Sequence, residues 1–279
     1  MSSLVNFLVN KDKNYIKISG NDSSDLINRI STNNIPIQKA NDSVITIFTD
    51  ENGRFIDVVN VLNLMEGFII MEVSKCFSQH VIDWVERYIF DEDVSISIIE
   101  NYKSFSIFHN ESSSELAINV FNSIEPNKVH LININGVDVY IVNTEFYNGH
   151  QCFRLIYLDS NGAESKIINY FSDNEIMLFE DEKFEEFRVK NLIPIAGKEI
   201  TNNFNPLELN MNKYIDFDKG CYIGQEVIAR LDTYNKVQRS MILIDSIKDK
   251  TLINNKLCEI TSSINNYSIG LVKKKALLN

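Results

Sequence analysis

The stretch DKGCYIGQEVIARL, residues 218–231, sets a cysteine between two glycines, just ahead of a helical pattern. Gly220 and Gly224 permit a tight or left-handed backbone on either side of Cys221, because glycine has no β-carbon. The apolar residues that follow recur at helical spacing, at Val227, Ile228 and Leu231. The pattern therefore predicts a loop that carries Cys221 into the N-terminus of a helix.

Two interpretations of Cys221 stay open. A helix N-terminus and a nearby cation, here Lys219, lower the pKa of a thiol and favour the reactive, metal-binding thiolate. Cys221 is thus a candidate for redox chemistry, ligation or nucleophilic attack, but it can equally be a small buried hydrophobe in a structural turn. Tyr222 is either a stacking platform or a core residue. Gln225 and Glu226 can hydrogen-bond a ligand, or Glu226 can simply favour the first turn of the helix.

Length and charge bound the class of protein. The chain has 279 residues, 44% of them hydrophobic, and a formal net charge of -11; this length suggests about two domains. Nucleic-acid surfaces normally show clustered basic residues, whereas the longest basic run is KKK at Lys273–Lys275, so we expect no direct nucleic-acid binding. The apolar runs are far shorter than a membrane span, and the N-terminus resembles neither a signal peptide nor a transit peptide. We therefore expect a cytoplasmic protein that does not enter a membrane.

The spacing of cysteines and histidines argues against a disulfide framework and against a zinc site. The four cysteines are far apart and form no CxxC pair, and the four histidines form no HxxxH or HxH pair. A chain of this size without a secretion signal rarely depends on disulfides, and zinc sites usually show close ligand spacing. We expect no metal site in which neighbouring residues supply the ligands.

Apolar periodicity predicts the fold class. Alternation and turn signals predict strands, including hairpins at Asn52–Gly53 and Asn135–Gly136, over residues 14–20, 43–63, 67–74, 93–100, 103–110, 129–144 and 151–159. Helical spacing predicts helices over residues 21–31, 76–90, 163–172 and 181–192. This order favours an α+β fold with antiparallel sheets over a doubly wound parallel sheet. After residue 236 short strands dominate, which predicts a small β module, and no nucleotide-phosphate loop motif is present.

The signature KGCYIGQE resembles that of the YgfZ-type folate-binding proteins, which are relatives of the glycine-cleavage T-protein, an aminomethyltransferase. The resembling residues are Lys219, Gly220, Cys221, Tyr222, Gly224, Gln225, Glu226 and Arg230. The upstream segment FRVKNLIPIAGKEI contributes Arg188, Pro194, Gly197 and Glu199, and NPLELN contributes Pro206 and Glu208. Near the start, residues 16–35 resemble the family's opening strand and helix, and DENGRFIDVVNV resembles its glycine hairpin. The resemblance covers most of the first 240 residues.

The resemblance implies a fold and a role. The implied fold is a three-domain ring: two interleaved ferredoxin-like modules over residues 1–236 would form a folate-type cavity, and residues 237–279 would form a short C-terminal β-barrel module. The implied cofactor is tetrahydrofolate, with a transient iron–sulfur cluster handled at Cys221. The implied partners are iron–sulfur client enzymes or cluster carriers and a reduced folate, and the family also carries a link to tRNA modification.

Departures from the family concern the folate site, for which the resemblance selects Asp57, Lys190 and Gln225. The T-protein branch has an Asp-Asp pair after its hairpin, where this chain has Asp57-Val58. On a regular strand Asp57 shares a face with Phe55, Val59 and Val61, so it is either an acid of raised pKa or a carboxylate paired with Arg54 or a backbone amide. Lys190 stands where the T-protein has a pterin-binding glutamate, and a lysine cannot accept the pterin N–H groups.

Three functions follow as hypotheses. The first is an iron–sulfur cluster assembly or maintenance factor with Cys221 as its working residue, which the KGCYIGQE stretch favours. The second is a tetrahydrofolate-dependent aminomethyl or methyl transferase, which needs a carboxylate at the one-carbon centre and a pterin acceptor. The third is a non-catalytic binding module that has lost its folate, which Lys190 and the short C-terminal module favour.

Overall fold

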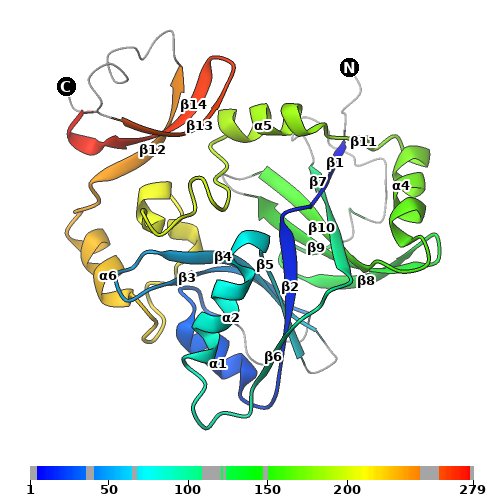
Figure 1. The fold of residues 1–279 in the computed structure, drawn as a ribbon, viewed down its shortest axis with the longest axis horizontal. Helices are drawn as coiled ribbons and strands as arrows, with labels where there is room; N and C mark the ends of the chain where they lie inside the picture. The colour runs from blue at the N-terminus through cyan, green and yellow to red at the C-terminus, as the bar shows by residue number, and fades with distance from the viewer. Residues whose placement is uncertain are drawn as a thin grey trace.

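The computed structural model describes residues 5–35, 41–64, 68–108, 121, 124–146, 150–245 and 258–276. Within these residues it contains three β-sheets flanked by short helices (Figure 1). The strand pairs of the described sheets are antiparallel, apart from the two-residue pairing of β1 with β11. The predicted α+β class with antiparallel sheets is confirmed.

The first sheet has five strands in the order β3-β4-β5-β2-β6. Its strands are β2 Lys13–Ser19, β3 Ser43–Thr49, β4 Phe55–Asn63, β5 Phe68–Ser74 and β6 Ser95–Ile98. Helices α1 (Ser23–Ile30) and α2 (Ser78–Glu86) lie on one face, with a 3-10 turn (η1, Lys75–Phe77) leading into α2. The apolar side chains whose spacing predicted the two helices are buried or partly buried there, in one cluster with strand residues.

The second sheet has six strands in the order β11-β1-β7-β10-β9-β8. Its strands are β1 Asn6–Val9, β7 Tyr102–Phe108, β8 Val129–Ile134, β9 Val137–Phe146, β10 His150–Leu158 and β11 Met177–Leu178. Helix α4 (Ala163–Asp173) packs on it through Ala163, Ile167 and Phe171. The sequence patterns missed β1 and β11, which are too short for a periodic signal. The longest described helix is α4, with 11 residues, so no described helix is long enough to cross a membrane.

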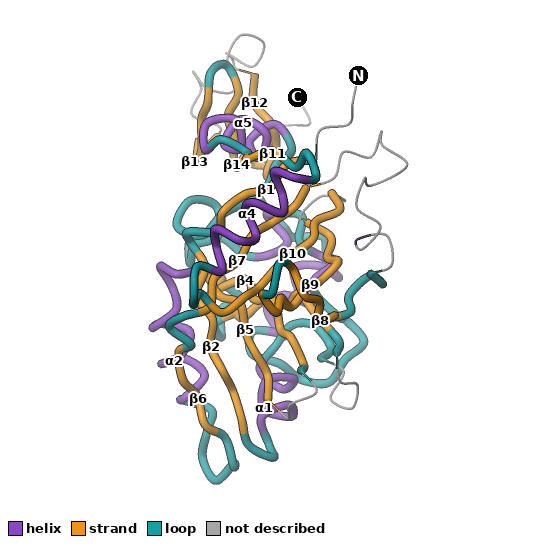
Figure 2. The backbone as a smooth tube through the Cα atoms, turned by 90° about the vertical axis from the view of Figure 1, so that its right-hand side faces the viewer, coloured by secondary structure: helices purple, strands orange, loops and turns teal. Residues whose placement is uncertain are grey.

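The two large sheets pack against each other, as the edge-on view shows (Figure 2). Between them lies an apolar cluster to which both contribute, including Tyr15 and Leu62 from the first sheet and Val142 and Ile156 from the second. An ion pair between Asp42 and Lys128 and a bridge at the same residues link the sheets at one end. The chain passes from β1 in the second sheet directly to β2 in the first, so the two sheets share one N-terminal segment.

The remaining elements close one side of this pair of sheets. They are α5 Asp181–Lys190, the 3-10 turns η2 Pro206–Leu209 and η3 Asn212–Tyr214, α6 Gln225–Thr233, the strands β12 Arg239–Asp245, β13 Cys258–Ile264 and β14 Tyr267–Lys273, and the turn η4 Lys274–Ala276. The described C-terminal residues form a three-stranded antiparallel sheet in the order β12-β14-β13. The three-domain ring, its boundary at residue 236 and the C-terminal barrel remain predictions.

Candidate functional site

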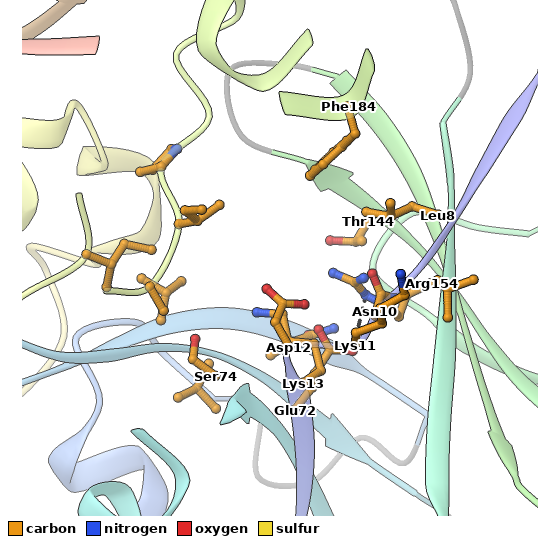
Figure 3. A pocket seen from close by; sticks show the side chains of 18 of the residues that line it. Leu8, Asn10, Lys11, Asp12, Lys13, Glu72, Ser74, Thr144, Arg154 and Phe184 are labelled. Atoms are coloured by element: carbon orange, nitrogen blue, oxygen red, sulfur yellow. Dashed lines mark ion pairs between the residues drawn. The ribbon is translucent and has the colours of Figure 1, made fainter. Parts of the chain in front are cut away.

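A central cavity of about 290 Å³ lies where the two large sheets meet the loop after α5 (Figure 3). Apolar side chains form part of its wall, among them Leu8, Val58, Phe184 and Ile195. The polar lining includes Asn10, Asp12, Lys13, Glu72, Thr144 and Arg154. A concave apolar site with a few convergent polar groups is the usual form of a small-molecule pocket, and this volume lies near the lower end of their range.

A buried ion pair forms one side of this cavity. Arg154 on β10 is 6% exposed and Glu72 on β5 is 3% exposed, and Nε of Arg154 lies 3.1 Å from Oε2 of Glu72. Arg154 also donates from Nη1 to the hydroxyl of Ser106. Tyr15 donates its hydroxyl to Oε2 of Glu72 at 3.2 Å; burial, and then the charge of Glu72, raise the pKa of Tyr15 and keep this donor protonated.

Thr144 contributes a hydroxyl that has no hydrogen-bond partner among the described residues. The residue is 4% exposed, and its Oγ1 makes no hydrogen bond with any residue that the structure describes. Thr144 pairs with Cys152 across β9 and β10, and Arg154 lies two residues beyond Cys152, on the same face of the sheet. The hydroxyl and the guanidinium therefore lie close together on one wall of the cavity (Figure 3).

Sequence reasoning missed this group, although a signal was present. Glu72 interrupts the apolar run FIIMEVS, and Arg154 interrupts CFRLIYL. A charged residue inside an otherwise apolar strand is rarely buried unless it is paired. Two such residues of opposite charge, each in its own apolar strand, would have indicated a buried ion pair. Thr144 carried no comparable signal.

The signature loop lies on the β3–β4 hairpin and not in the central cavity, whose lining includes none of its residues. Gly224 has φ +81°, and a β-carbon there would lie 2.5 Å from the carbonyl oxygen of Asp50. Thr49 donates its hydroxyl to the carbonyl of Ile223 at 2.6 Å. Tyr222 is buried and packs in the apolar cluster that also contains Val58 and Ile228. The loop is thus held tightly at Gly224, while the side chain of Cys221 is exposed.

Lys219 anchors the same loop to helix α1. Its ammonium donates to the backbone carbonyls of Asn28, Ser31 and Asn33 at 2.6, 2.8 and 2.8 Å. Partial burial lowers the pKa of Lys219 to about 8. The cation that the sequence sets beside Cys221 therefore binds the carboxyl end of α1, where cations are favoured by the unpaired carbonyls.

The rest of the signature is solvent-facing or partly exposed. Gly220 has open space around it. Gln225 is the first residue of α6, and Glu226 and Arg230 are exposed along that helix. The predicted loop-to-helix transition at the signature is confirmed, with Gly224 in the left-handed conformation at its start.

Asp57 is a buried carboxylate held by Ser74. It is fully buried, and it accepts the backbone N–H of Ser74 at 2.7 Å and the Ser74 hydroxyl at 2.8 Å. Burial raises the pKa of Asp57, against the opposing effects of Lys13 and of the Ser74 hydrogen bonds. Asp57 does not line the central cavity. Both features that the sequence suggested for it, a raised pKa and a backbone amide partner, are present in the structure.

The predicted face of Asp57 needs one correction. A register shift places Asp57 opposite Phe48 and Phe55 opposite Thr49, so the strand bulges between them. A bulge reverses the alternation of side chains. Phe55 accordingly joins the cluster near η2 and β14, whereas Val59 and Val61 join the cluster under α1 and α2.

Lys190 also lies outside the lining of the central cavity. Its ammonium pairs with Glu186 and sits 4.8 Å from the ring centre of Tyr267 on β14. The cavity side of α5 carries Asp181, Phe184 and Glu185. Since Lys190 is five residues beyond Glu185, it lies roughly 140° around the helix, on another face. The structure therefore brings none of Asp57, Lys190 and Gln225 together at this cavity.

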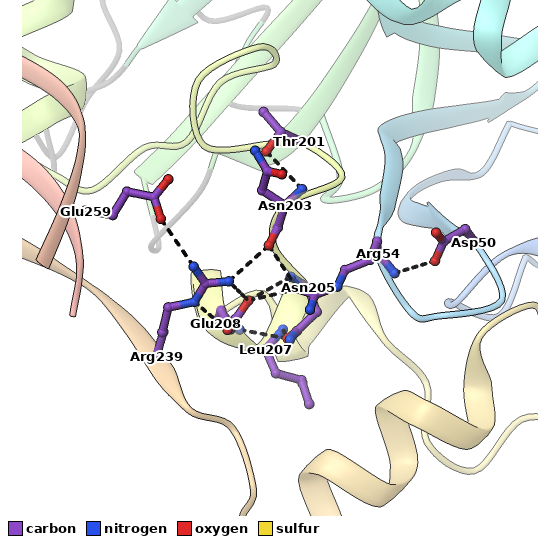
Figure 4. Close-up of polar contacts among 9 residues, drawn as sticks. All are labelled: Asp50, Arg54, Thr201, Asn203, Asn205, Leu207, Glu208, Arg239 and Glu259. Carbon is purple, nitrogen blue, oxygen red and sulfur yellow. Dashed lines mark hydrogen bonds and ion pairs between the residues drawn. The ribbon is translucent and has the colours of Figure 1, made fainter. Parts of the chain in front are cut away.

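Among the other family residues, Arg188, Glu199 and Glu208 build two polar junctions. Glu208 accepts from the backbone N–H of Asn205 at 3.1 Å and from Nε of Arg239 at 2.9 Å, and it pairs with Arg54 (Figure 4). Arg239 also reaches Glu259 on β13. These contacts join the β3–β4 hairpin, η2 and the C-terminal sheet.

The second junction centres on Arg188, which is completely buried. It contacts Glu185 and Glu199 and donates to the Ser262 hydroxyl at 2.7 Å. Glu199 in turn accepts from the hydroxyls of Thr261 and Ser262. Arg188 and Glu199 therefore stabilise the packing of α5 and the loop after it on the C-terminal sheet.

Comparison with known proteins agrees with this architecture. The tRNA-modifying protein YgfZ of Buchnera aphidicola is 22% identical over 223 residues, which cover 79% of this chain and 67% of that protein. The mitochondrial iron–sulfur cluster assembly factor IBA57 homolog of Dictyostelium discoideum is 22% identical over 274 residues, which cover 86% of this chain and 62% of that protein. The chain thus spans about two thirds or less of the length of these relatives.

A solved structure supports the fold. The glycine cleavage system aminomethyltransferase T from Bartonella henselae matches with a TM-score of 0.76 at 12% identity, covering 98% of this chain and 79% of that one. A family model described as the GCVT N-terminal domain matches residues 11–219. The chain therefore belongs to the GCVT N-terminal domain family, as a YgfZ-type relative of the aminomethyltransferase T-protein.

Proposed function

We propose that this protein is an iron–sulfur cluster assembly or maintenance factor that uses the exposed thiol of Cys221 and carries a tetrahydrofolate-type ligand in its central cavity. Its relatives include one named as a YgfZ protein and one named as an iron–sulfur cluster assembly factor. The cluster would be cargo, received from a carrier or delivered to a client enzyme.

The exposed position of Cys221 carries this proposal. A thiol must be reachable to contact a cluster held by another protein, and a thiolate is the form that ligates iron. The surrounding loop is held by Lys219 on α1 and by Gly224 against the hairpin. A site supported on rigid elements keeps its reacting atom in one place.

Aminomethyl transfer is less well supported. That reaction needs an accessible carboxylate at the one-carbon centre, and Asp57 was the acid that the sequence offered. Both oxygens of Asp57 are engaged by Ser74, and the side chain is fully buried. Asp12 lines the central cavity, but its position was not selected by any resemblance.

A module that has lost its ligand is also less well supported. A cavity of about 290 Å³ has room for a small heterocycle. Its wall keeps a buried hydroxyl, that of Thr144, without a partner among the described residues. An unpaired buried polar atom costs free energy, and a ligand would offset that cost.

The test is rescue of an iron–sulfur enzyme's activity in cells that lack this protein. We expect wild type and Cys76→Ser to restore the activity and Cys221→Ser to fail. Cys76 is the matched control because it is a second exposed cysteine, far from the signature in sequence. Rescue by Cys221→Ser at equal protein level would show that the thiol is not the working group.

A further inference from the structure

Phe90 is the most exposed large apolar side chain that the structure describes. It is 81% exposed and lies on the loop that leads from α2 to β6. The loop is nevertheless held in place, because the backbone N–H of Phe90 donates to Glu92 at 2.7 Å. A β-carbon on Gly20 would lie 1.9 Å from the carbonyl oxygen of Asp93, so the loop also packs against the turn before α1. An aromatic ring kept in water on a fixed backbone is typical of an interface anchor.

A shallow hollow of about 470 Å³ lies beside Phe90. The rest of its lining is charged and consists of Asp22, Asp25, Arg29, Asp91 and Glu92. Arg29 is shared between Asp25 at 2.9 Å and Glu92 at 2.7 Å, and Asp91 has no cation among the described residues. The hollow thus combines an aromatic ring with excess negative charge. This combination suits a guanidinium group, which pairs with carboxylates and stacks on aromatic faces.

Helix α1 joins this hollow to the signature loop. Asp25 and Arg29 are exposed on the helix, and Asn28 accepts from Lys219 through its backbone carbonyl and its side chain. Figure 1 shows α1 between the segment that precedes α6 and the loop into β6. Since α1 is only about 12 Å long, the exposed thiol of Cys221 and the ring of Phe90 lie along one surface. We call this surface the α1 face; it comprises Asp25, Asn28, Arg29, Phe90, Asp91, Phe217, Asp218 and Cys221.

The signature end of the α1 face has the same chemistry as the hollow. Phe217 is 39% exposed, and Asp218 is exposed without an ion pair to any described residue. The ammonium of Lys219 is directed at the carbonyls of α1, so it does not offset this charge at the surface. Both ends of the face therefore offer an aromatic ring beside a carboxylate. A partner with positive charge is complementary to such a face, and the net charge of -11 favours its approach.

We propose that the α1 face docks a partner protein that presents arginine and aliphatic side chains, with one arginine in the hollow beside Phe90. The inference rests on the proposed function in one respect: a partner on this face would reach Cys221 and would be the cluster carrier or client. It gives that partner a chemical description, a basic surface with aliphatic side chains next to its own cluster ligands.

A fluorescently labelled peptide, LRRLLRRLLRRL, serves as the probe, because a helix of this length spans about 18 Å and covers α1. The peptide LEELLEELLEEL is its acidic control and should not bind. By fluorescence anisotropy we expect the wild type to bind the basic peptide and Phe90→Ser to bind it at least about fivefold more weakly. Leu131→Ser is the matched control, because Leu131 is 61% exposed on β8; its affinity should equal that of the wild type. No binding to the wild type, or equal losses in the two variants, would overturn the proposal.

A pair of double variants separates local charge from net charge. One carries Asp91→Asn and Asp218→Asn in the α1 face, and the other carries Asp138→Asn and Asp173→Asn elsewhere; all four positions are exposed. The two double variants have the same net charge. Loss of two exposed ion pairs should weaken peptide binding about three- to tenfold in the first variant, while the second keeps the wild-type affinity. Equal losses would show that the peptide responds only to net charge, and would overturn the proposal.

Alkylation of the thiols tests whether a molecule on the α1 face reaches the signature. Bound LRRLLRRLLRRL should slow the alkylation of Cys221 and leave that of Cys76 unchanged. Cys76 is the control because it is also exposed and lies before α2, at the opposite end of that helix from Phe90. Equal slowing of both thiols, or of neither, would contradict a continuous α1 face and overturn the proposal.

Failure of this inference and failure of the proposed function are distinguishable. Cys221→Ser should bind LRRLLRRLLRRL like the wild type, whether or not it rescues the iron–sulfur enzyme. If Cys221→Ser fails to rescue and Phe90→Ser still binds the peptide like the wild type, only the docking surface is wrong. If Cys221→Ser rescues while the peptide results are as expected, the docking surface stands and the role of the thiol is wrong.

Discussion

The signature loop and the cavity wall that contains Glu72, Thr144 and Arg154 differ in how visible they are in the sequence and in what their residues contact. The loop is conspicuous in sequence, yet most of its residues hold structure: Lys219 binds α1, Tyr222 is buried, and Gly224 touches the hairpin. The wall has no motif, yet Arg154 and Thr144 face the cavity. The difference teaches that a rare local pattern can mark a backbone conformation that only certain residues allow. Polar groups that line a cavity, in contrast, can come from strand positions without any motif.

The largest expected effect concerns the wall. Arg154→Met should lower the free energy of unfolding by about 3–5 kcal/mol, because it leaves Glu72 as a buried, unpaired charge. Arg154→Met combined with Glu72→Met should recover most of that loss. Urea denaturation of the single and double variants measures both changes. If the single variant were as stable as wild type, the Arg154–Glu72 pair would not stabilise the fold. The contrast drawn here between the wall and the loop would then be wrong.

The next largest loss of stability is expected from a substitution in the signature loop. Gly224→Ala should cost about 3 kcal/mol, since alanine is strained at φ +81° and its β-carbon would lie 2.5 Å from a backbone oxygen. Gly220→Ala is the matched control: a β-carbon there meets nothing within 4 Å, so we expect a change below about 0.5 kcal/mol. Chemical denaturation compares them, and equal costs at the two glycines would contradict the docking of the loop on the hairpin.

The smallest effect concerns Asp57 and depends on pH. Its pKa in the folded protein is raised above 3.8, chiefly by burial, so the folded state holds more protons than the unfolded chain between the two values. Its contribution to stability is therefore greatest at low pH and is lost as pH rises through the folded pKa.

Asp57→Asn should remove this pH dependence while keeping both contacts with Ser74, because an amide can accept the N–H and donate to the hydroxyl. We expect its free energy of unfolding to stay within about 1 kcal/mol of wild type at pH 7. Thermal unfolding between pH 4 and 7 gives the difference profile. A wild-type curve that rises relative to the variant with pH would reverse the sign and show a carboxylate stabilised as an ion.

The sequence alone predicted the fold class and most of the elements. Residues 43–63 form the predicted hairpin and residues 21–31 contain α1, because apolar alternation and helical spacing act over a few neighbouring residues. The four-residue β1 and the two-residue β11 escaped, since their pairing depends on strands more than 90 residues away. The bulge between Phe48 and Thr49 escaped as well, and it changed the face on which Phe55 lies.

For the candidate site, too, some features follow from neighbouring residues in the sequence and others only from the folded structure. The sequence determined the signature loop, its glycines and the family, because these depend on residues that are consecutive. Only the tertiary structure decided that Lys219 binds the carboxyl end of α1 and that Lys190 lies on another face of α5 from the cavity. It also decided that Glu72, Thr144 and Arg154 share one wall. The physical reason is that the wall is built from β5 of one sheet and β9 and β10 of the other, so it exists only after the two sheets have packed together. The spacing of residues along the chain does not show which strands will meet.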